Sequence, residues 1–460
     1  MVTNLTLPDT PRQWHARIWS LSWPVIVANI TIPMVGLADT AVMGQMPEPA
    51  YIGAVAVGAT IFSAIYWMLG FLRMGTTGLV AQALGAGQTE ELIAIATRAF
   101  ITALVIGVVV LALNVPLYRL AFWIFDASDT VETLAGRYFT IRIWGSPALM
   151  LYLVELGVLF GMQKVRQTLL ISLLLNLTNI LLDIVFVLGF GWGVAGVAAA
   201  TILAEWSAAI AGLVIVFRTL QASGWQGNWP QKLWTRHKTM HLFEVSGNLI
   251  IRSFFVQFPF FTFTVIGAAF GDLILAANAV LMQFFYLMAF ALDAFAHTAE
   301  TLSGFAFGAR KPSALRRATI YSLVWALAFA VFITLNYALF GSALIAMLSQ
   351  SSEVRNMAES LLPWVIAGPG AAVLAFLLDG VFIGTTRTRE LRNSMFLAAL
   401  IYCSVLVLTL DSLGNQGLWL ALTTFLAVRG ILLAVQYPKI EKLCRQQTSH
   451  SDSAESGTIV

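Results

Sequence analysis

The 460-residue chain has few charged residues: Asp, Glu, Lys and Arg together make up 11% of it. Soluble proteins are about one quarter charged, and a chain this long with so few charges cannot cover a globular surface. The composition therefore excludes a soluble enzyme of two or three domains. Apolar residues make up 59% of the chain, and roughly twelve spans of about 20 residues would absorb most of them. The sequence predicts an all-α polytopic membrane protein.

Cysteine and histidine are also scarce. The two cysteines, Cys403 and Cys444, suggest no disulfide framework, and the five histidines show no metal-ligand spacing. The chain has no nucleophile–base pair and no phosphate-binding loop, so we expect neither an enzyme nor a cofactor, and no nucleic-acid partner. Arg12 and Arg17 precede a long apolar run without a small-residue cleavage site. That run is therefore expected to remain as the first span.

Long apolar runs separated by Gly, Pro and charged loops predict twelve transmembrane helices. Several runs exceed about 25 residues, so those helices should tilt or project beyond the bilayer. The expected limits are 17–44, 52–83, 93–116, 139–161, 168–189, 193–217, 242–266, 274–307, 316–347, 360–384, 394–411 and 416–436.

Lysine and arginine are unevenly distributed among the loops. With the N-terminus in the cytoplasm, nineteen of them fall in cytoplasmic segments, and the outer segments hold only Arg119, Arg137, Arg142 and Arg355. This bias follows the positive-inside rule and places both termini in the cytoplasm. We therefore expect a multi-pass protein of the bacterial plasma (inner) membrane, acting as a monomer.

The two halves of the chain resemble each other at an offset of 223 residues. The matched pairs are Ala56-Val57 with Ala279-Val280, Gly85-Ala86 with Gly308-Ala309, Gly145 with Gly368, Gly157 with Gly380, Gly161 with Gly384, and Arg166 with Arg389. Because six spans separate the copies, both have the same orientation, and the repeat is parallel. Two six-helix lobes that face each other form a cleft, and their rocking gives alternating access. This architecture favours a transporter, although a duplicated bundle could also be a scaffold.

The repeat divides the chain into five segments. We expect a cytoplasmic N-terminus (1–16), an N-lobe (17–217), a cytoplasmic linker between the lobes (218–241), a C-lobe (242–437) and a tail (438–460). The tail is polar and lacks a long apolar run, so it is expected to be disordered and cytoplasmic.

Polar residues gather at one depth in the N-lobe. Asp39, Asp183 and Thr201 lie about five, six and eight residues from the outer ends of spans 1, 5 and 6, which places them roughly 7, 9 and 12 Å deep. Asn179 shares the helix face of Asp183, and Asn176 continues that stripe. Ionisable groups at membrane depth are costly and usually functional.

The C-lobe has no ionisable equivalent of this cluster, because the repeat offset sends Asp39 to Thr262 and Asp183 to Leu406. The fold alone therefore does not require it. Two adjacent carboxyl groups in a low-dielectric environment can bind and release a proton near neutral pH. The oxygens of Asp39, Asn179, Asp183 and Thr201 could equally bind Na⁺. The structural alternative is that these groups only link helices by hydrogen bonds.

The C-lobe has polar groups of its own. Asp293, His297 and Glu300 follow one helical face of span 8. Asp379 lies in span 10, and Arg252 in span 7 could neutralise one of these acids. This pattern favours a structural ion-pair network over a second coupling site, although both remain open.

Pro24 and Pro33 lie within span 1. A proline removes a backbone hydrogen bond and kinks a helix. A kinked helix that also carries a protonatable Asp39 could act as a conformational switch. Prolines are also common in membrane spans without such a role.

Three motifs resemble those of the DinF branch of the MATE (multidrug and toxic compound extrusion) family of transporters. They are the segment 23–44 with Pro24 and Asp39, the segment Phe71-Leu72-Arg73-Met74-Gly75-Thr76-Thr77-Gly78-Leu79, and Asp379-Gly380-Val381-Phe382-Ile383-Gly384. The likeness covers essentially residues 15–440 and keeps the order of the motifs.

The resemblance implies twelve helices in two lobes that form a V-shaped central cleft. It implies that Asp39 is the central coupling residue, that Asn179, Asp183 and Thr201 complete its network, and that Tyr138 belongs to the same site. It also implies that Pro24 is the proline that bends the first helix on protonation. Other branches of the family use C-lobe acids instead, and Asp379 stands where one of those would be. The glutamate expected on helix 7 is missing.

Residues and resemblance together predict a secondary antiporter for multidrug efflux. It would export amphipathic, mostly cationic compounds in exchange for H⁺, or for Na⁺. The alternative is a flippase for lipid-linked anionic precursors, which calls for a cationic cavity. The predicted spans instead carry more acids than bases: Asp39, Glu155, Asp183, Glu205, Asp293, Glu300 and Asp379 against Arg73, Arg252 and Arg429.

Overall fold

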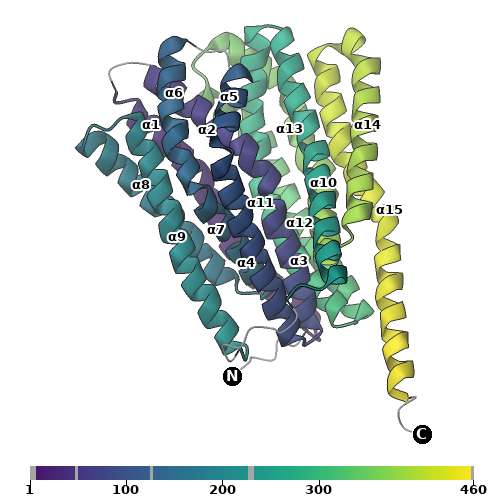
Figure 1. Cartoon of the computed structure of the whole chain (residues 1–460). Coiled ribbons are helices and arrows are strands. Elements are labelled where there is room, and N and C mark those ends of the chain that lie inside the picture. Colours follow the sequence, from purple (N-terminus) through teal and green to yellow (C-terminus); the bar gives the residue numbers. More distant parts are fainter. Residues whose placement is uncertain (1–6, 47–49, 125–127, 226–232, 457–460) are drawn as a thin grey trace. The chain divides into compact units, whose positions relative to one another are not determined.

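The computed structural model describes residues 7–46, 50–124, 128–225 and 233–456, with side chains as far as residue 448 (Figure 1). This described part is helical and contains no strands. The helices are α1 (Pro11–Met43), α2 (Ala50–Leu69), α3 (Phe71–Gly85), α4 (Thr89–Ala112), α5 (Asn114–Ile124), α6 (Asp129–Arg142), η1 (Ile143–Gly145), α7 (Ser146–Gly161), α8 (Val165–Asp183), η2 (Ile184–Gly189), α9 (Val194–Ala222), α10 (Arg236–Ala269), α11 (Asp272–Gly308), α12 (Pro312–Leu348), α13 (Ser352–Gly384), α14 (Thr388–Leu413) and α15 (Asn415–Ser456).

Within the described residues, twelve helical segments are long and apolar enough to cross a membrane. They confirm the twelve predicted spans. Some spans are interrupted: a break at Gly70 separates α2 from α3, and the 3₁₀ turn η1 separates α6 from α7. Pro147 occupies the first turn of α7, where a proline is tolerated because no intrahelical N–H bond is lost.

The helix α1 begins earlier than expected, at Pro11 instead of residue 17. The reason is a capping box: Gln13 N donates to Thr10 Oγ1 (3.4 Å), and Thr10 N donates to the Gln13 side-chain oxygen (3.2 Å). Pro11 is the first helical residue, and its ring holds the backbone angle φ at a helical value. Residues 1–6 of the predicted N-terminal segment lie outside the described part.

The chain divides into two compact units. The first contains Trp23–Thr239, and the second contains Met240 onward together with the first turns of α1 as far as Ser22. The predicted linker 218–241 is partly helical, because α9 continues to Ala222 and α10 starts at Arg236. Residues 226–232 of that linker lie outside the described part.

Corresponding helices pack in the same way inside each unit. In the first unit α7 packs against α3, α4 and α9, and α8 packs against α9. In the second unit α13 packs against α11, α12 and α15, and α14 packs against α15. These are the pairs that the predicted repeat relates, so each unit builds the same helical framework around its own central helix, α7 or α13.

Repeated glycines explain the close packing of these central helices. A Cβ on Gly157 would lie 2.8 Å from the carbonyl oxygen of Arg73, and a Cβ on Gly380 would collide with the carbonyl oxygen of Ala296. Both glycine and neighbour are displaced by 223 residues between the two contacts. The same holds one turn further along, at Gly161 and Gly384. Small residues allow helix backbones to approach closely in membranes, so the repeated glycines mark one conserved contact geometry.

The polar tail is helical where we expected disorder, because α15 runs without interruption to Ser456. Ile440 and Cys444 are both buried, and their spacing places them on one helix face. Thr448 Oγ1 also donates a hydrogen bond to the Arg310 carbonyl oxygen (2.8 Å). The packing of this face extends the helix beyond the apolar span. The high charge content of the tail hides this buried face in the sequence.

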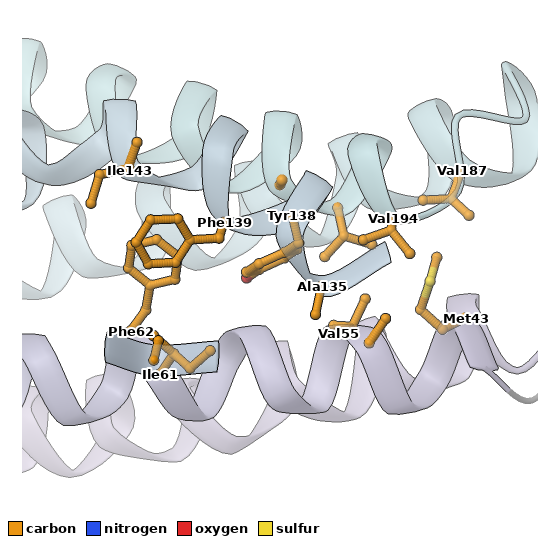
Figure 2. Close-up of a cluster of buried hydrophobic side chains, with 14 of the residues drawn as sticks. Met43, Val55, Ile61, Phe62, Ala135, Tyr138, Phe139, Ile143, Val187 and Val194 are labelled. Carbon is orange, nitrogen blue, oxygen red and sulfur yellow. The ribbon is translucent and has the colours of Figure 1, made fainter. Parts of the chain in front are cut away.

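A cluster of buried apolar side chains lies inside the first unit (Figure 2). It brings together Met43 of α1, Phe62 of α2, Tyr138 of α6, Val187 of η2 and Val194 of α9. Five elements meet here, from α1 at Met43 to α9 at Val194. The cluster therefore holds in place the ends of the helices that carry the polar site described next.

Candidate functional site

The structure brings Asp39 and Asp183 together. Asp39 lies on α1 and is half-buried, whereas Asp183 is the last residue of α8 and is fully buried. Their carboxyl groups lie within hydrogen-bonding reach of each other. Two ionised carboxylates are both acceptors, so this hydrogen bond exists only when one of them carries a proton.

The backbone changes at this point, because α8 gives way to the π-helical segment η2 directly after Asp183. Single π-helical turns are rare and are found frequently at functional sites. Here the wider turn follows the carboxyl group and leads into Val187, which packs into the apolar cluster.

Two hydrogen bonds extend the site along one face of α8. Asn179 Nδ2 donates to Thr201 Oγ1 of α9 (3.1 Å), and Asn176 Nδ2 donates to Thr31 Oγ1 of α1 (2.5 Å). Together with Asp183, these asparagines join α8 to both neighbouring helices. Sequence spacing predicted the shared face, and the structure adds the partner Thr31, which the spacing did not reveal.

Several oxygens of the site have no donor. Among the described residues, no group donates a hydrogen bond to Asp39 Oδ1, to Asn179 Oδ1 or to either carboxyl oxygen of Asp183, and all four atoms are buried. Buried polar atoms normally have a partner, and each exception calls for an explanation. A bound proton or a small cation would satisfy a group of acceptors of this kind.

Arg142 enters the site from the end of α6. It is buried, whereas the sequence placed it in an outer segment, so that interpretation was wrong. Its Nη1 donates to Glu205 Oε2 of α9 (2.8 Å), and a second, shorter contact makes the pair bidentate. The guanidinium also lies over the rings of Phe62 and Tyr66, 5.2 and 5.5 Å from their centroids. The pair and the rings together stabilise a charge that would otherwise be costly to bury.

Tyr138 interacts electrostatically with both groups of charges. It is buried on α6, and its hydroxyl lies within electrostatic range of Asp39, Asp183 and Arg142. The arginine follows Tyr138 by four residues, and Glu205 follows Thr201 by four residues on α9. This helical spacing was the sequence signal that could have revealed both members of the ion pair.

Pro24 is buried within α1, one residue after the chain passes from the second unit to the first. The helix continues through it and through Pro33, which is exposed. The bending of α1 on protonation therefore stays a prediction.

In the second unit, Asp379 is held by two arginines. Its Oδ2 accepts hydrogen bonds from Arg429 (2.7 Å) and from Arg252. Arg429 lies within electrostatic range of Asp293. His297 Nδ1 lies 3.3 Å from Glu300 Oε2. Asp379 thus pairs with the expected Arg252 and, in addition, with Arg429. The choice between a structural network and a second coupling site among the C-lobe acids stays a prediction.

No group of three or more His, Cys, Asp or Glu side chains in the described part could hold a metal ion. Cys403 and Cys444 are both free thiols. The oxygens gathered around Asp183 come from carboxyl, amide and hydroxyl groups, which suit a proton or a hard cation.

Comparison with known proteins identifies the family. A family model described as MatE matches residues 24–185 and 249–408, one stretch in each half of the repeat. The DNA damage-inducible protein F of Escherichia coli (strain K12) is 41% identical to this chain, over 91% of the chain and 90% of that protein. The chain belongs to the MatE family. Members of this family are secondary transporters, so the protein is a multi-pass transporter of the inner membrane for small molecules, not an enzyme.

More distant relatives agree with this assignment. A probable multidrug resistance protein NorM of Bacillus subtilis (strain 168) is 21% identical, over 92% of this chain and 95% of its own length. The crystal structure of the Vibrio cholerae MATE transporter VcmN in the bent form has a TM-score of 0.84 at 20% identity, covering 95% of this chain and 98% of that one. This likeness shows that the chain shares the MATE fold.

Proposed function

We propose that this MatE-family protein is an antiporter that exports amphipathic, mostly cationic compounds in exchange for protons, with Asp39 and Asp183 as the coupling site. The observation that supports it is the carboxyl pair itself. Its two groups face each other within hydrogen-bonding reach, and several of their oxygens lack a donor among the described residues. One bound proton would join α1 to α8 through a hydrogen bond.

Loss of that proton has two physical consequences. The two carboxylates then repel each other, and this repulsion is strong where water is excluded. The pair also attracts cations, because the neighbouring Arg142 is already neutralised by Glu205. A cationic compound therefore binds the deprotonated site, and a returning proton displaces it. Rearrangement of α1 around Pro24 would link this exchange to alternating access.

The same oxygens would also serve Na⁺. Carboxyl oxygens of Asp39 and Asp183, the amide oxygen of Asn179 and the hydroxyl of Thr201 are hard ligands of the kind that such cations prefer. We favour the proton because it alone turns the contact between two carboxyl groups into a hydrogen bond. The transport experiment below distinguishes the two ions.

The substrate class follows from charge and from relatives. The NorM protein of Bacillus subtilis is described as a probable multidrug resistance protein. The first unit carries the buried acids Asp183 and Glu205 and the half-buried Asp39, with Arg142 as the base of the site. An anionic lipid-linked precursor, the cargo of the alternative flippase, would be repelled by this excess of acids. We propose further that both termini lie in the cytoplasm, which the positive-inside bias of the loops supports.

The test uses everted membrane vesicles with an established pH gradient and a reporter of lumenal pH. Addition of a lipophilic cation such as ethidium should release protons from the lumen of vesicles that contain the wild-type protein. The Asp39→Asn variant should give no release, because the pair can no longer exchange its proton. The matched control is Asp411→Asn, which removes an exposed acid of α14 and should behave as the wild type.

Each outcome has a clear reading once membrane insertion of every variant is verified. Undiminished exchange by Asp39→Asn would refute the coupling site. A response that requires Na⁺ would keep the antiporter and change the ion. No response with either ion would point to the flippase, or to a substrate outside the cationic class.

A further inference from the structure

Glu155 of α7 is a fully buried carboxyl group outside the site described above. Its exposed fraction is 0%, and neither of its oxygens accepts a hydrogen bond from any described residue. α7 ends at Gly161, so Glu155 lies about 9 Å along the helix from the end that leads to Lys164. An ionised carboxylate in this position would have lost its hydration without receiving a counter-ion or a donor.

The neighbouring helix α9 is shaped to receive this carboxyl group. A Cβ on Gly212 would collide with the carboxyl carbon and an oxygen of Glu155. The carboxyl group therefore rests directly on the backbone of α9, where any side chain at position 212 would displace it. Ala208 and Ala209, which precede Gly212, are small and fully buried. The pocket thus accommodates the acid without offering it a charged partner.

Three charged groups on the helices around α7 have neighbours other than Glu155. On α3, the guanidinium of Arg73 lies over the ring of Phe160, 5.9 Å from its centroid. On α4, Arg98 pairs with Glu91. The helix α9 contributes Glu205, which is paired with Arg142. From α8 comes the neutral Ser172, which is hydrogen-bonded to Tyr152.

A row of hydrogen-bonded pairs leads from the coupling site to Glu155. Along one face of α8, Asp183 is followed by the pairs Asn179–Thr201 (3.1 Å), Asn176–Thr31 (2.5 Å) and Ser172–Tyr152 (2.9 Å). The successive positions on α8 differ by three or four residues, so they share one face.

The last pair connects this row to α7. Tyr152 precedes Glu155 by three residues, which makes the two side chains neighbours on the helix surface. Its hydroxyl lies within electrostatic range of the Glu155 carboxyl group. The row therefore runs from the Asp39–Asp183 pair to Glu155 inside the first unit.

We propose that Glu155 is a second proton-binding site of the N-lobe, which receives the proton from the Asp39–Asp183 pair and releases it toward the Lys164 end of the lobe. This inference rests on the proposed function, because it supplies the exit path for the coupled proton. A proton needs a single lone pair, whereas a metal cation needs several oxygen ligands at once, and the pocket on Gly212 supplies no such set. Water must carry the proton past Asn179 and Asn176, because a side-chain amide does not relay protons.

The first experiment detects the proton directly. Infrared difference spectra of the purified wild-type protein, recorded between acidic and alkaline pH, should contain the carbonyl-stretch band of a buried protonated carboxylic acid. One component of that band should be missing in Glu155→Gln, which keeps the shape of the side chain and removes the titratable group. The control Glu359→Gln removes an exposed acid of α13 and should keep every component.

The second experiment follows transport in proteoliposomes. Glu155→Gln should bind ethidium with wild-type affinity and exchange it for protons more slowly, on the order of tenfold or more, because a proton relay has been removed. Gly212→Ala keeps the acid and should slow exchange by displacing it. Gly247→Ala is the matched control, because a Cβ at that position meets no atom within 4 Å.

The outcomes separate this inference from the proposed function. An infrared spectrum unchanged in Glu155→Gln, or a wild-type exchange rate in both Glu155→Gln and Gly212→Ala, would overturn the role of Glu155. If the wild-type protein exchanged no protons for ethidium, the proposed function would fail. The infrared test of Glu155 as a proton-binding group would still give its answer.

Discussion

Asn179 Nδ2 donates a hydrogen bond to Thr201 Oγ1, which ties α8 to α9 one helical turn from Asp183. The Thr201 hydroxyl in turn donates to the Val197 carbonyl oxygen of its own helix (2.9 Å). It is therefore fixed as an acceptor for Asn179. This relationship positions the asparagine whose amide oxygen remains available to the coupling site.

Replacement of the Thr201 hydroxyl should affect the coupling site. Thr201→Val leaves the buried Asn179 amide without its acceptor and should lower the free energy of unfolding by about 1–3 kcal/mol. Ethidium–proton exchange should slow as well, whereas Thr201→Ser should preserve both properties. Thermal unfolding in detergent and exchange in proteoliposomes measure the two effects. The control Thr60→Val removes an exposed hydroxyl that bonds only within its own helix.

The buried pair of Arg142 and Glu205 should behave as one unit. Either single variant, Arg142→Met or Glu205→Met, leaves one buried charge uncompensated and should cost about 3–5 kcal/mol. The double variant should cost clearly less than the sum of the two, which a double-mutant cycle of unfolding free energies will show. By comparison, the exposed Lys238 pairs with Glu91, and Lys238→Met, which leaves the Arg98–Glu91 pair intact, should cost at most about 1 kcal/mol. Additive costs at Arg142 and Glu205 would contradict the paired arrangement.

Asp379 should matter for stability and not for coupling. Asp379→Asn leaves Arg252 and Arg429 without their shared carboxylate, which should destabilise the protein by about 3–5 kcal/mol. The fraction that inserts and folds should still exchange protons for ethidium, since the coupling site lies in the other lobe. Exchange normalised to folded protein is the measurement. Complete loss of coupling in folded Asp379→Asn would show instead that the C-lobe acid takes part in ion transfer.

The repeated glycines should be intolerant of a single added methyl group. Gly380→Ala places a Cβ against the Ala296 carbonyl oxygen, and Gly157→Ala does the same at Arg73. Both should lower the unfolding free energy by about 1–3 kcal/mol through overpacking. Gly370→Ala lies in the same helix as Gly380 and meets no atom within 4 Å. It should be neutral or slightly stabilising, because alanine favours a helix more than glycine does.

Much of this architecture was predictable, because membrane burial leaves a strong pattern in the sequence. The twelve spans follow from apolar length, and the repeat follows from glycines at a fixed offset. The part of the site that lies on one helix was predictable from residue spacing, because Asp183, Asn179 and Asn176 share a face of α8. The contact of Asp39 with this face depends on how α1 packs beside α8. Local sequence patterns do not predict that packing.

The errors have equally physical causes. Arg142 was counted with the outer segments because it is charged and lies near the outer end of a predicted span. Its compensation by Glu205 comes from a distant helix. The early start of α1 depended on two reciprocal hydrogen bonds between Thr10 and Gln13. The tail was assigned to disorder by composition, although Ile440 and Cys444 are buried. The V-shaped cleft between the lobes and the monomeric state stay predictions.

The division of α1 between the two units has a consequence for biogenesis. Trp14 is fully buried and stacks against Tyr321, and the Trp325 indole donates a hydrogen bond to His15, 310 residues away in the chain. The ribosome makes the first turns of α1 about 310 residues before it makes these partners. Until then this end of α1 lacks these partners, so its first turns are the last part of the helix to reach their final environment.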